Sequence, residues 1–252
     1  MNWTNTLFVV IPAYNEAKTI EDIVRRTIAH CENIIVVDDG SSDGTGDLAS
    51  DLPVRVVRNE RNLGKGASLL AGMREALVQG ALAVITMDGD GQHTPEAIPA
   101  LVKQAQDRPR CIVAGSRLHD PTAIPRARYQ ANTVANFWIS WASGHWIEDS
   151  QCGLRLYPRE VLDLICAKPR RLSGFVFESE VLIDAAAAGY RCVCVPIPAL
   201  YDGHTHRPSH FRPVRDIAAI VVMVAGKLFS RGMYPSGFRS SRRERRAAAE
   251  ES

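Results

Sequence analysis

Short apolar runs alternate with longer amphipathic segments along the first half of the chain. The apolar runs are rich in Val and Ile and predict strands, whereas the longer segments predict helices. We expect strands over residues 7–11, 33–37, 54–57, 82–87 and 111–114, and helices over residues 19–30, 45–51, 66–79 and 95–106. This alternation predicts an α/β fold with a mostly parallel central sheet and helices on both faces.

The pattern changes after residue 118. We expect helices over residues 126–147, 159–167, 177–188 and 214–231, and strands over residues 154–157 and 192–196. Residues 236–252 are rich in Ser, Arg, Ala and Glu, a composition that predicts disorder. The expected organisation is a folded domain over residues 1–202, a basic loop and apolar helix over residues 203–235, and a disordered basic tail over residues 236–252.

Pairs of carboxylates follow two of the predicted strands. Asp88 and Asp90 follow the strand that ends near residue 87, and Asp38 and Asp39 follow the strand at 33–37. In an open α/β sheet, ligands bind beyond the carboxyl ends of the strands, so these side chains are expected at the ligand edge. Carboxylate and amide oxygens suit Mg²⁺ or Mn²⁺. An acidic surface turn is the alternative, because Asp-Gly pairs are common in turns.

The familiar phosphate-binding fingerprints do not fit. The segment Gly64-Lys65-Gly66-Ala67-Ser68 lacks the third glycine of the dinucleotide pattern. It also lacks the upstream glycine of a P-loop and the Ser or Thr directly after the lysine. The sheet edge is therefore expected to bind its ligand in another way.

The charge of the chain is unevenly distributed. The whole chain of 252 residues, 46% hydrophobic and 23% charged, has a net charge of +2. Residues 203–252 contain 10 Lys and Arg against 4 Asp and Glu, whereas residues 1–202 contain 20 against 24. The basic end suggests an anionic surface as its neighbour.

The six cysteines include no Cys-x-x-Cys pair, so we expect neither a zinc site nor a disulfide framework, and a reducing cytosol fits best. The chain runs straight into a strand and contains no apolar run of 18 residues, so neither a signal peptide nor a membrane-spanning helix is expected.

Four segments together resemble the family 2 glycosyltransferases, in the dolichyl-phosphate mannose synthase-like, or polyprenyl-phosphate glycosyltransferase, branch. The segments, in chain order, are Val10-Ile11-Pro12-Ala13-Tyr14-Asn15-Glu16, Val36-Val37-Asp38-Asp39-Gly40-Ser41-Ser42-Asp43-Gly44-Thr45, Asn62-Leu63-Gly64-Lys65-Gly66 and Met87-Asp88-Gly89-Asp90-Gly91-Gln92-His93. The resemblance covers residues 7–200 and weakens beyond them. It implies a GT-A fold, Rossmann-like and in a single domain with a C-terminal helical extension, together with a nucleotide-sugar donor, a divalent metal and inversion at the anomeric carbon.

The resemblance also implies roles for individual residues. Asp88, Asp90 and Gln92 would hold Mg²⁺ or Mn²⁺ and, through it, the donor diphosphate. The residues implied to lie at or beside the nucleoside pocket are Pro12, Tyr14, Glu16, Asp38 and Asp39, with Gly64 and Lys65 near the nucleotide. Arg117, in a Gly-Ser-Arg that follows a strand in this branch, would face phosphate; a surface arginine is the alternative.

Asp149 begins a segment, Asp149-Ser150-Gln151-Cys152-Gly153-Leu154-Arg155, that resembles another motif of the family. There the aspartate lies near the acceptor. With an alcohol acceptor it would act as a general base, whereas a phosphate acceptor is already ionised and would need only to be oriented. With Asp90 and Arg117, Asp149 is a candidate catalytic residue; a plain loop aspartate is the alternative.

Three features of the second half leave alternatives open. Tyr129, Phe137, Trp138, Trp141 and Trp146 form an aromatic segment that suits either the core or a membrane interface and acceptor channel. The cationic loop at 204–213 offers Arg212, helped by Arg207 or His210, as a phosphate contact. The apolar helix at 217–226 suits burial, a homodimer contact, or an in-plane anchor at an anionic leaflet.

We therefore expect a metal-dependent inverting glycosyltransferase that moves a sugar from a UDP- or GDP-sugar to a polyprenyl phosphate. The alternatives are a glycosyltransferase with a soluble or lipid alcohol acceptor and a non-catalytic nucleotide-sugar-binding scaffold. The expected partners are the nucleotide-sugar, a lipid-linked acceptor, an anionic membrane surface and a second copy of the chain, but no nucleic acid. The expected location is the cytoplasm, with peripheral attachment to the inner face of the membrane.

Overall fold

The computed structural model describes residues 5–167, 174–199 and 213–250. Within them, a seven-stranded sheet has the order β3-β2-β1-β4-β6-β5-β7. The strands are β1 (Leu7–Ala13), β2 (Ile34–Asp38), β3 (Arg55–Arg58), β4 (Ala83–Thr86), β5 (Cys111–Ser116), β6 (Arg155–Pro158) and β7 (Arg191–Pro196). The helices are α1 (Ile20–Ile28), α2 (Thr45–Ser50), α3 (Lys65–Val78), α4 (Ile98–Asp107), α5 (Arg126–Ser143), α6 (Arg159–Ala167), α7 (Gly174–Ala187), α8 (Pro213–Phe229) and α9 (Pro235–Glu250), with single 3-10 turns η1 (Pro95–Ala97) and η2 (Pro121–Ala123).

The sheet is mostly parallel, as the sequence predicted. Only the pairings of β6, with β4 and with β5, are antiparallel among those described. After β5 the chain continues through α5 and then returns to the edge of the sheet where β5 ended. The contact of Asp149 with Arg117 lies at this edge. From that edge the next strand can only run back through the sheet, against its neighbours. The sequence pattern predicted this strand but not its direction.

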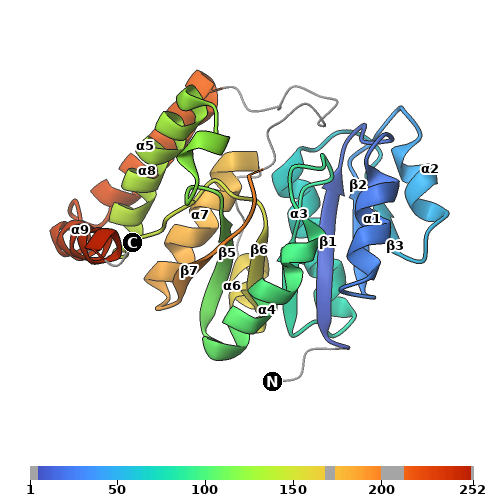
Figure 1. Cartoon of the computed structure of the whole chain (residues 1–252), viewed down its shortest axis with the longest axis horizontal. Coiled ribbons are helices and arrows are strands. Elements are labelled where there is room, and N and C mark those ends of the chain that lie inside the picture. The colour runs from blue at the N-terminus through green and yellow to red at the C-terminus, as the bar shows by residue number, and fades with distance from the viewer. Residues whose placement is uncertain (1–4, 168–173, 200–212, 251–252) are drawn as a thin grey trace.

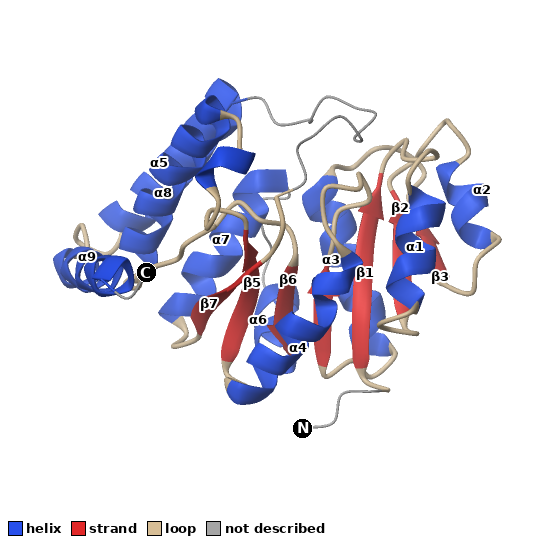
Figure 2. Cartoon of the chain, viewed as in Figure 1, coloured by secondary structure: helices blue, strands red, loops and turns tan. Residues whose placement is uncertain are grey.

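The core has two parts, one on each face of the sheet. Alternate residues of β1 divide between them, since successive side chains of a strand point to opposite faces. Phe8 and Val10 pack with the apolar sides of α3 and α5–α8, whereas Val9 and Ile11 pack with those of α1, α2 and α4. Figure 2 shows the resulting layers, with helices on both faces as predicted.

Helices α5, α8 and α9 form an extension beyond the β7 edge (Figure 1). The aromatic segment of α5 is packed within the protein: Trp138 stacks on Trp141 with ring centroids 5.4 Å apart, and Phe137 meets Phe238 of α9 at 6.3 Å. On α8, Val224 is buried while Val222 is 67% exposed, so one side of this helix is covered. Among the described residues, no helix combines the length and the apolar composition needed to cross a membrane.

The prediction of a disordered tail over 236–252 is wrong for residues 236–250, which belong to α9. Its many arginines suggested a solvated chain, but tertiary contacts fix the helix. Phe238 packs edge-to-face on Trp141 at 5.1 Å. Glu244 accepts the backbone N–H of Trp146 at 3.0 Å and pairs with Arg191 at 2.7 Å. The good helix-formers Ala, Arg and Glu support the helix locally.

Candidate active site

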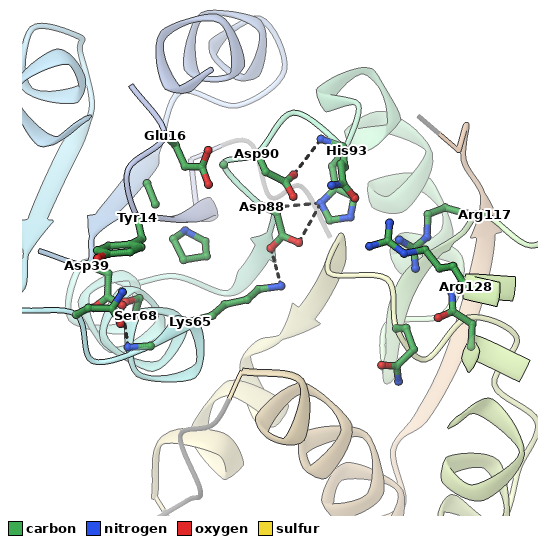
Figure 3. Close-up of a pocket in the computed structure, with 18 residues that line it drawn as sticks. Tyr14, Glu16, Asp39, Lys65, Ser68, Asp88, Asp90, His93, Arg117 and Arg128 are labelled. Carbon is green, nitrogen blue, oxygen red and sulfur yellow. Dashed lines mark hydrogen bonds and ion pairs between the residues drawn. The ribbon is translucent and has the colours of Figure 1, made fainter. Parts of the chain in front are cut away.

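A cavity of about 360 Å³ opens at the carboxyl ends of β1, β2, β4 and β5 (Figure 3). Its lining includes most of the residues chosen from the sequence: Pro12, Tyr14, Glu16, Asp39, Gly64, Lys65, Asp88, Asp90, Gln92 and Arg117. Of the other candidates in the described chain, Asp38 and Asp149 lie outside the lining. Arg212 lies outside the described residues, as do Arg207 and His210 of the same loop.

Asp39 organises one side of this cavity. Its carboxylate accepts the backbone N–H groups of Leu63 and Gly64 at 2.9 and 2.8 Å and the side-chain amide of Asn59 at 2.7 Å. These bonds tie the loop before α3 to the end of β2. Asp39 therefore helps to shape the part of the cavity that Tyr14 and Gly64 also line.

Asp38 has a structural position. One oxygen of its carboxylate accepts the backbone N–H of Ser41 at 3.0 Å, which closes the turn after β2. The other oxygen packs against Gly46 of α2, so closely that an added Cβ would clash with it. Asp38 thus lies beside the cavity, beneath the loop, rather than in its wall.

The loop after β1 is fixed to the loop after β2. Asn15 has a positive φ of 55°, and its backbone N–H donates to the Ser41 hydroxyl at 2.9 Å. The backbone N–H of Glu16 donates to the Thr45 hydroxyl at 2.8 Å. The two loops are thus joined side by side at this edge of the sheet.

Asp88 and Asp90 lie close together after β4, at the centre of the cavity in Figure 3. Lys65 pairs with Asp88 through a contact of 2.7 Å from Nζ to Oδ1. Burial alone would raise the pKa of Asp88, but the charge of Lys65, with smaller effects from His93 and Arg117, lowers this pKa to about 2. Burial and the negative charge of Asp88 raise the pKa of Asp90 to about 6. Two carboxylates that repel each other in one buried turn favour a cation between them.

The donor groups fit Mg²⁺ or Mn²⁺. Asp88, Asp90 and Gln92 present two carboxylates and an amide oxygen to the same cavity, and such hard oxygen ligands are those both ions prefer. The described residues contain no group of three or more His, Cys, Asp or Glu side chains that could hold a metal ion; the set of Asp88, Asp90 and Gln92 has only two such side chains and adds an amide. Two carboxylates and one amide leave coordination positions for the oxygens of a ligand.

The buried ring of His93 holds the turn that carries Asp88 through a hydrogen bond. The backbone N–H of Asp88 donates to His93 Nδ1 at 3.1 Å, so this nitrogen is an acceptor and the proton lies on Nε2, which faces the Cys152 thiol at 3.8 Å. Burial, opposed by the charge of Asp88 but aided by Arg117, lowers the pKa of His93 to about 4. The ring is therefore neutral at physiological pH, and its approach of 3.8 Å to Asp88 Oδ2 is not an ion pair.

Arg117 and Asp149 form a buried ion pair on the opposite side of the cavity. Two nitrogens of the guanidinium meet both carboxylate oxygens at 2.9 and 3.1 Å, and the backbone N–H of Arg117 adds a third bond at 3.2 Å. Asp149 is fully buried, and although burial raises its pKa, the charge of Arg117 outweighs this and lowers it below the usual range. Arg117 reaches the cavity, whereas Asp149 lies behind it.

Eight lining residues had no predicted role of their own: Ala13, Asn62, Ser68, Gly89, His93, Arg128, Asn132 and Gln151. Only Arg128 and Asn132 lie outside the motifs identified in the sequence. Arg128 and Asn132 come from α5, where they stand one helical turn apart on the same side. Other polar residues of α5, such as Gln130 and Asn136, surround this pair in the sequence, so it gave no distinct signal. Glu178, which pairs with Lys65 at 3.1 Å, gave none either, because Ser179 and Glu180 follow it directly in α7.

Comparison with known proteins agrees with this geometry. Residues 8–164 match the sequence model of glycosyl transferase family 2. The chain belongs to this family. A UDP-N-acetylglucosamine–dolichyl-phosphate N-acetylglucosaminyltransferase of Methanococcus voltae is 30% identical over 216 residues, which cover 77% of this chain and 86% of that protein. A polyprenol monophosphomannose synthase of Mycolicibacterium smegmatis is 35% identical over 205 residues, which cover 77% of each chain.

This family 2 glycosyltransferase also resembles solved structures. Glucosyl-3-phosphoglycerate synthase from Mycobacterium tuberculosis, in complex with Mn²⁺, UDP and glucosyl-3-phosphoglycerate, superposes with a TM-score of 0.63 over 90% of this chain and 79% of that chain. The sequence identity is 22%, so the likeness concerns the fold. The predicted GT-A fold is confirmed, and so are the predicted enzyme class and the branch of named polyprenyl-phosphate transferases among its relatives.

Proposed function

We propose that this glycosyltransferase binds a UDP- or GDP-sugar through Mg²⁺ or Mn²⁺ and transfers the sugar, with inversion, to a polyprenyl phosphate. One observation carries the proposal: a single cavity is lined by the carboxylates of Asp88 and Asp90 and by the guanidinium groups of Arg117 and Arg128. The first pair suits a cation and the second pair suits phosphate.

The donor side consists of two regions. Pro12, Tyr14 and Asp39 line the region proposed for the nucleoside, and Glu16 and Gly64 border it. Asp88, Asp90 and Gln92 are the residues that would hold the cation. When bound there, the cation would neutralise the charge that develops on the departing diphosphate. Lys65 supplies a second positive charge at the same place.

The acceptor side is proposed to bind an anion. The guanidinium of Arg117 is fixed because it donates two hydrogen bonds to Asp149, and a fixed guanidinium recognises phosphate well. An acceptor phosphate oxygen would attack the anomeric carbon opposite the diphosphate; the new C–O bond forms as the bond to the diphosphate breaks. This oxygen is already ionised, so the step needs no general base.

The position of Asp149 argues against an alcohol acceptor. A general base must reach the proton that it removes. Asp149 is fully buried behind Arg117, and both its oxygens are engaged by the guanidinium. We propose that Asp149 positions Arg117, and that Arg117 and Asp90 act on the substrates.

The same acceptor implies contact with a membrane. Arg239, Arg242, Arg243 and Arg246 are exposed on α9, and Val222 and Phe229 are exposed on α8. Cationic and apolar groups on two helices that both pack against α5 would suit peripheral binding to the anionic cytoplasmic leaflet. A homodimer contact through α8 is the other proposal for the apolar residues. Salt-sensitive binding to anionic liposomes would support the first, and a concentration-dependent dimer without liposome binding would support the second.

A transfer assay tests the function. The purified protein is incubated with UDP- and GDP-sugars, Mn²⁺ or Mg²⁺, and either a polyprenyl phosphate or a soluble sugar alcohol. We expect one nucleotide-sugar to support transfer to the polyprenyl phosphate, with loss of transfer in excess chelator. Efficient transfer to the alcohol alone would reject the acceptor, and full activity in chelator would reject the metal.

A further inference from the structure

Lys65 stands between two carboxylates that come from different parts of the fold. Its Nζ lies 2.7 Å from Asp88 Oδ1 and 3.1 Å from Glu178 Oε2. Lys65 begins α3, Asp88 follows β4, and Glu178 belongs to α7. One ammonium group therefore links a proposed metal ligand to a buried carboxylate that has no place in the proposed metal set.

The surroundings of Asp88 crowd both of its oxygens. Both pack against Gly153, where an added Cβ would come within 2.8 Å of Oδ2 and 3.1 Å of Oδ1. His93 lies on the Oδ2 side, with Nδ1 3.8 Å from that oxygen, and Lys65 occupies Oδ1. A divalent cation that binds Asp88 would therefore lie close to the Lys65 ammonium, and the repulsion between the two positive charges favours one of them at a time.

Glu178 is held in place and incompletely satisfied. Its backbone carbonyl accepts a hydrogen bond of 2.9 Å from the fully buried Arg155, and the residue is 4% exposed. Within the described residues, its second oxygen, Oε1, has no hydrogen-bond partner. A buried, partly unsatisfied carboxylate lowers the stability of the fold, so its presence calls for an explanation. Here Glu178 gives the Lys65 ammonium a second partner, which remains available when a divalent cation binds Asp88.

We propose that the Lys65 ammonium neutralises Asp88 in the ligand-free enzyme. When a divalent cation takes the place of Lys65 at Asp88, Glu178 acts as a positioning residue that keeps Lys65 at the cavity. The inference rests on the proposed use of a metal and a nucleotide-sugar. Lys65, released from Asp88 but retained by Glu178, then faces the donor diphosphate.

This arrangement couples the two ligands. A nucleoside diphosphate draws Lys65 away from Asp88 and so favours the cation, and by reciprocity the cation favours the nucleoside diphosphate. Without its nucleotide, the enzyme should bind the cation weakly, because Lys65 competes for the same carboxylate. The coupling factor between Mn²⁺ and the nucleotide is thus the quantity that reports on Lys65.

The experiment measures the binding of Mn²⁺, UDP and GDP, each alone and in combination, with correction for the Mn²⁺–nucleotide complex in solution. For Lys65→Met we expect Mn²⁺ to bind the nucleotide-free protein about tenfold more tightly and the coupling factor to fall by about tenfold, within the usual range of such couplings. Glu178→Gln should weaken nucleotide binding in the presence of Mn²⁺ by about tenfold.

A double-mutant cycle tests positioning directly. In the Lys65→Met background, Glu178→Gln should have no further effect on nucleotide affinity, since Glu178 acts only through Lys65. The double variant also removes one charge of each sign. If Lys65→Met alone fails to fold, the double variant is compared with Glu178→Gln, and a lower coupling factor in the double variant still reports on Lys65. Glu180→Gln is the matched control: it makes the same change on α7, but Glu180 pairs with Lys227 at 3.2 Å. It should leave nucleotide affinity and coupling unchanged.

The outcomes separate this inference from the proposed function. If the wild type binds Mn²⁺ and a nucleotide but Lys65→Met keeps the full coupling, the inference is wrong and the proposed function stands. An equal loss from Glu178→Gln with and without Lys65 would overturn the positioning role. A wild type that binds neither Mn²⁺ nor either nucleotide overturns the proposed function and this inference together.

Discussion

Two halves of the sheet face the same cavity with opposite charges. The half formed by β1, β2 and β4 contributes carboxylates that directly follow buried strands, among them Asp39, Asp88 and Asp90. The half formed by β5 and α5 contributes the guanidinium groups of Arg117 and Arg128. Figure 3 shows Asp88 and Asp90 between the Tyr14 side, where Asp39 also lies, and the two arginines.

The two halves also differ in how their charges are held. In the first half, Asp39 is satisfied mainly by backbone N–H groups of a neighbouring loop, and the raised pKa of Asp90 reflects burial beside another carboxylate. In the second half, Arg117 is fixed by a carboxylate from a distant loop. The first half therefore has the carboxylates that the proposed donor-bound cation would need, and the second has the guanidinium groups that the proposed anionic acceptor would need. Variants of Asp90, Asp149 and Asp39 test this division, and a variant of His145 tests a stabilising contact away from the cavity.

Asp90→Ala should have the largest effect, because it removes a charge from the proposed cation site. We expect the transfer rate to fall by about a thousandfold or more, the loss expected when a metal no longer stabilises the leaving group. The fold should persist, since the charged form of Asp90 is disfavoured in the metal-free protein. Asp47→Ala, which removes an exposed acid paired with Arg58 outside the cavity, is the control. A rate within tenfold of the wild type in Asp90→Ala would remove Asp90 from the site.

Asp149→Asn should affect the second half alone. Breaking a buried ion pair at one partner costs about 3–5 kcal/mol of unfolding free energy, and a misplaced Arg117 should lower the transfer rate by about a hundredfold. Nucleoside diphosphate affinity should stay at the wild-type value. Calorimetry and chemical unfolding measure the two effects separately. A loss of nucleotide affinity as large as the loss of rate would contradict the division between the halves.

Asp39→Ala should affect the first half through its loop. The N–H groups of Leu63 and Gly64 lose their acceptor, and we expect about a tenfold loss of nucleoside diphosphate affinity, equivalent to about 1.4 kcal/mol. Titration calorimetry with UDP and GDP measures this. Asp38→Ala is the neighbouring control, since Asp38 lies outside the cavity wall, and it should change stability rather than affinity. Equal affinities in Asp39→Ala and the wild type would exclude Asp39 from the nucleoside region.

His145 should give the smallest effect, on stability and far from the chemistry. Its Nε2 accepts the backbone N–H of Cys192 at 3.0 Å, and burial, with the charge of Arg191, lowers its pKa to about 4. In the unfolded chain the imidazole of His145 becomes protonated near pH 6.5, whereas in the folded protein it becomes protonated only near pH 4. Between these two pH values the unfolded chain therefore binds more protons than the folded protein. The stabilisation is complete above pH 6.5 and is lost as the pH falls towards 4. Thermal unfolding should show a shallower acid loss in His145→Gln; an unchanged profile would exclude His145 as its source.

The positions of the strands, and the carboxylates that follow them, could be predicted from the amino-acid sequence. Short continuous apolar runs and the glycine-rich turns after them are local signals, and a parallel sheet necessarily brings the carboxyl ends of its strands to one edge. For that reason the amino-acid sequence alone was enough to assign Asp39, Asp88 and Asp90 to one site. The family motifs, being contiguous, gave Gln92, Gly64 and Lys65 in the same way.

The pairing of these charges could not be predicted from the sequence, because it depends on contacts between distant segments. The Arg117–Asp149 pair joins residues 32 positions apart, and the contact of Lys65 with Glu178 spans α3 and α7. The antiparallel direction of β6 and the docking of α9 through Phe238 likewise depend on how separate elements pack. Local pattern fixes the face and the end of an element on which a residue stands. Which partner meets it there depends on the packing of the whole chain, because contacts between distant segments form only when their elements share a core.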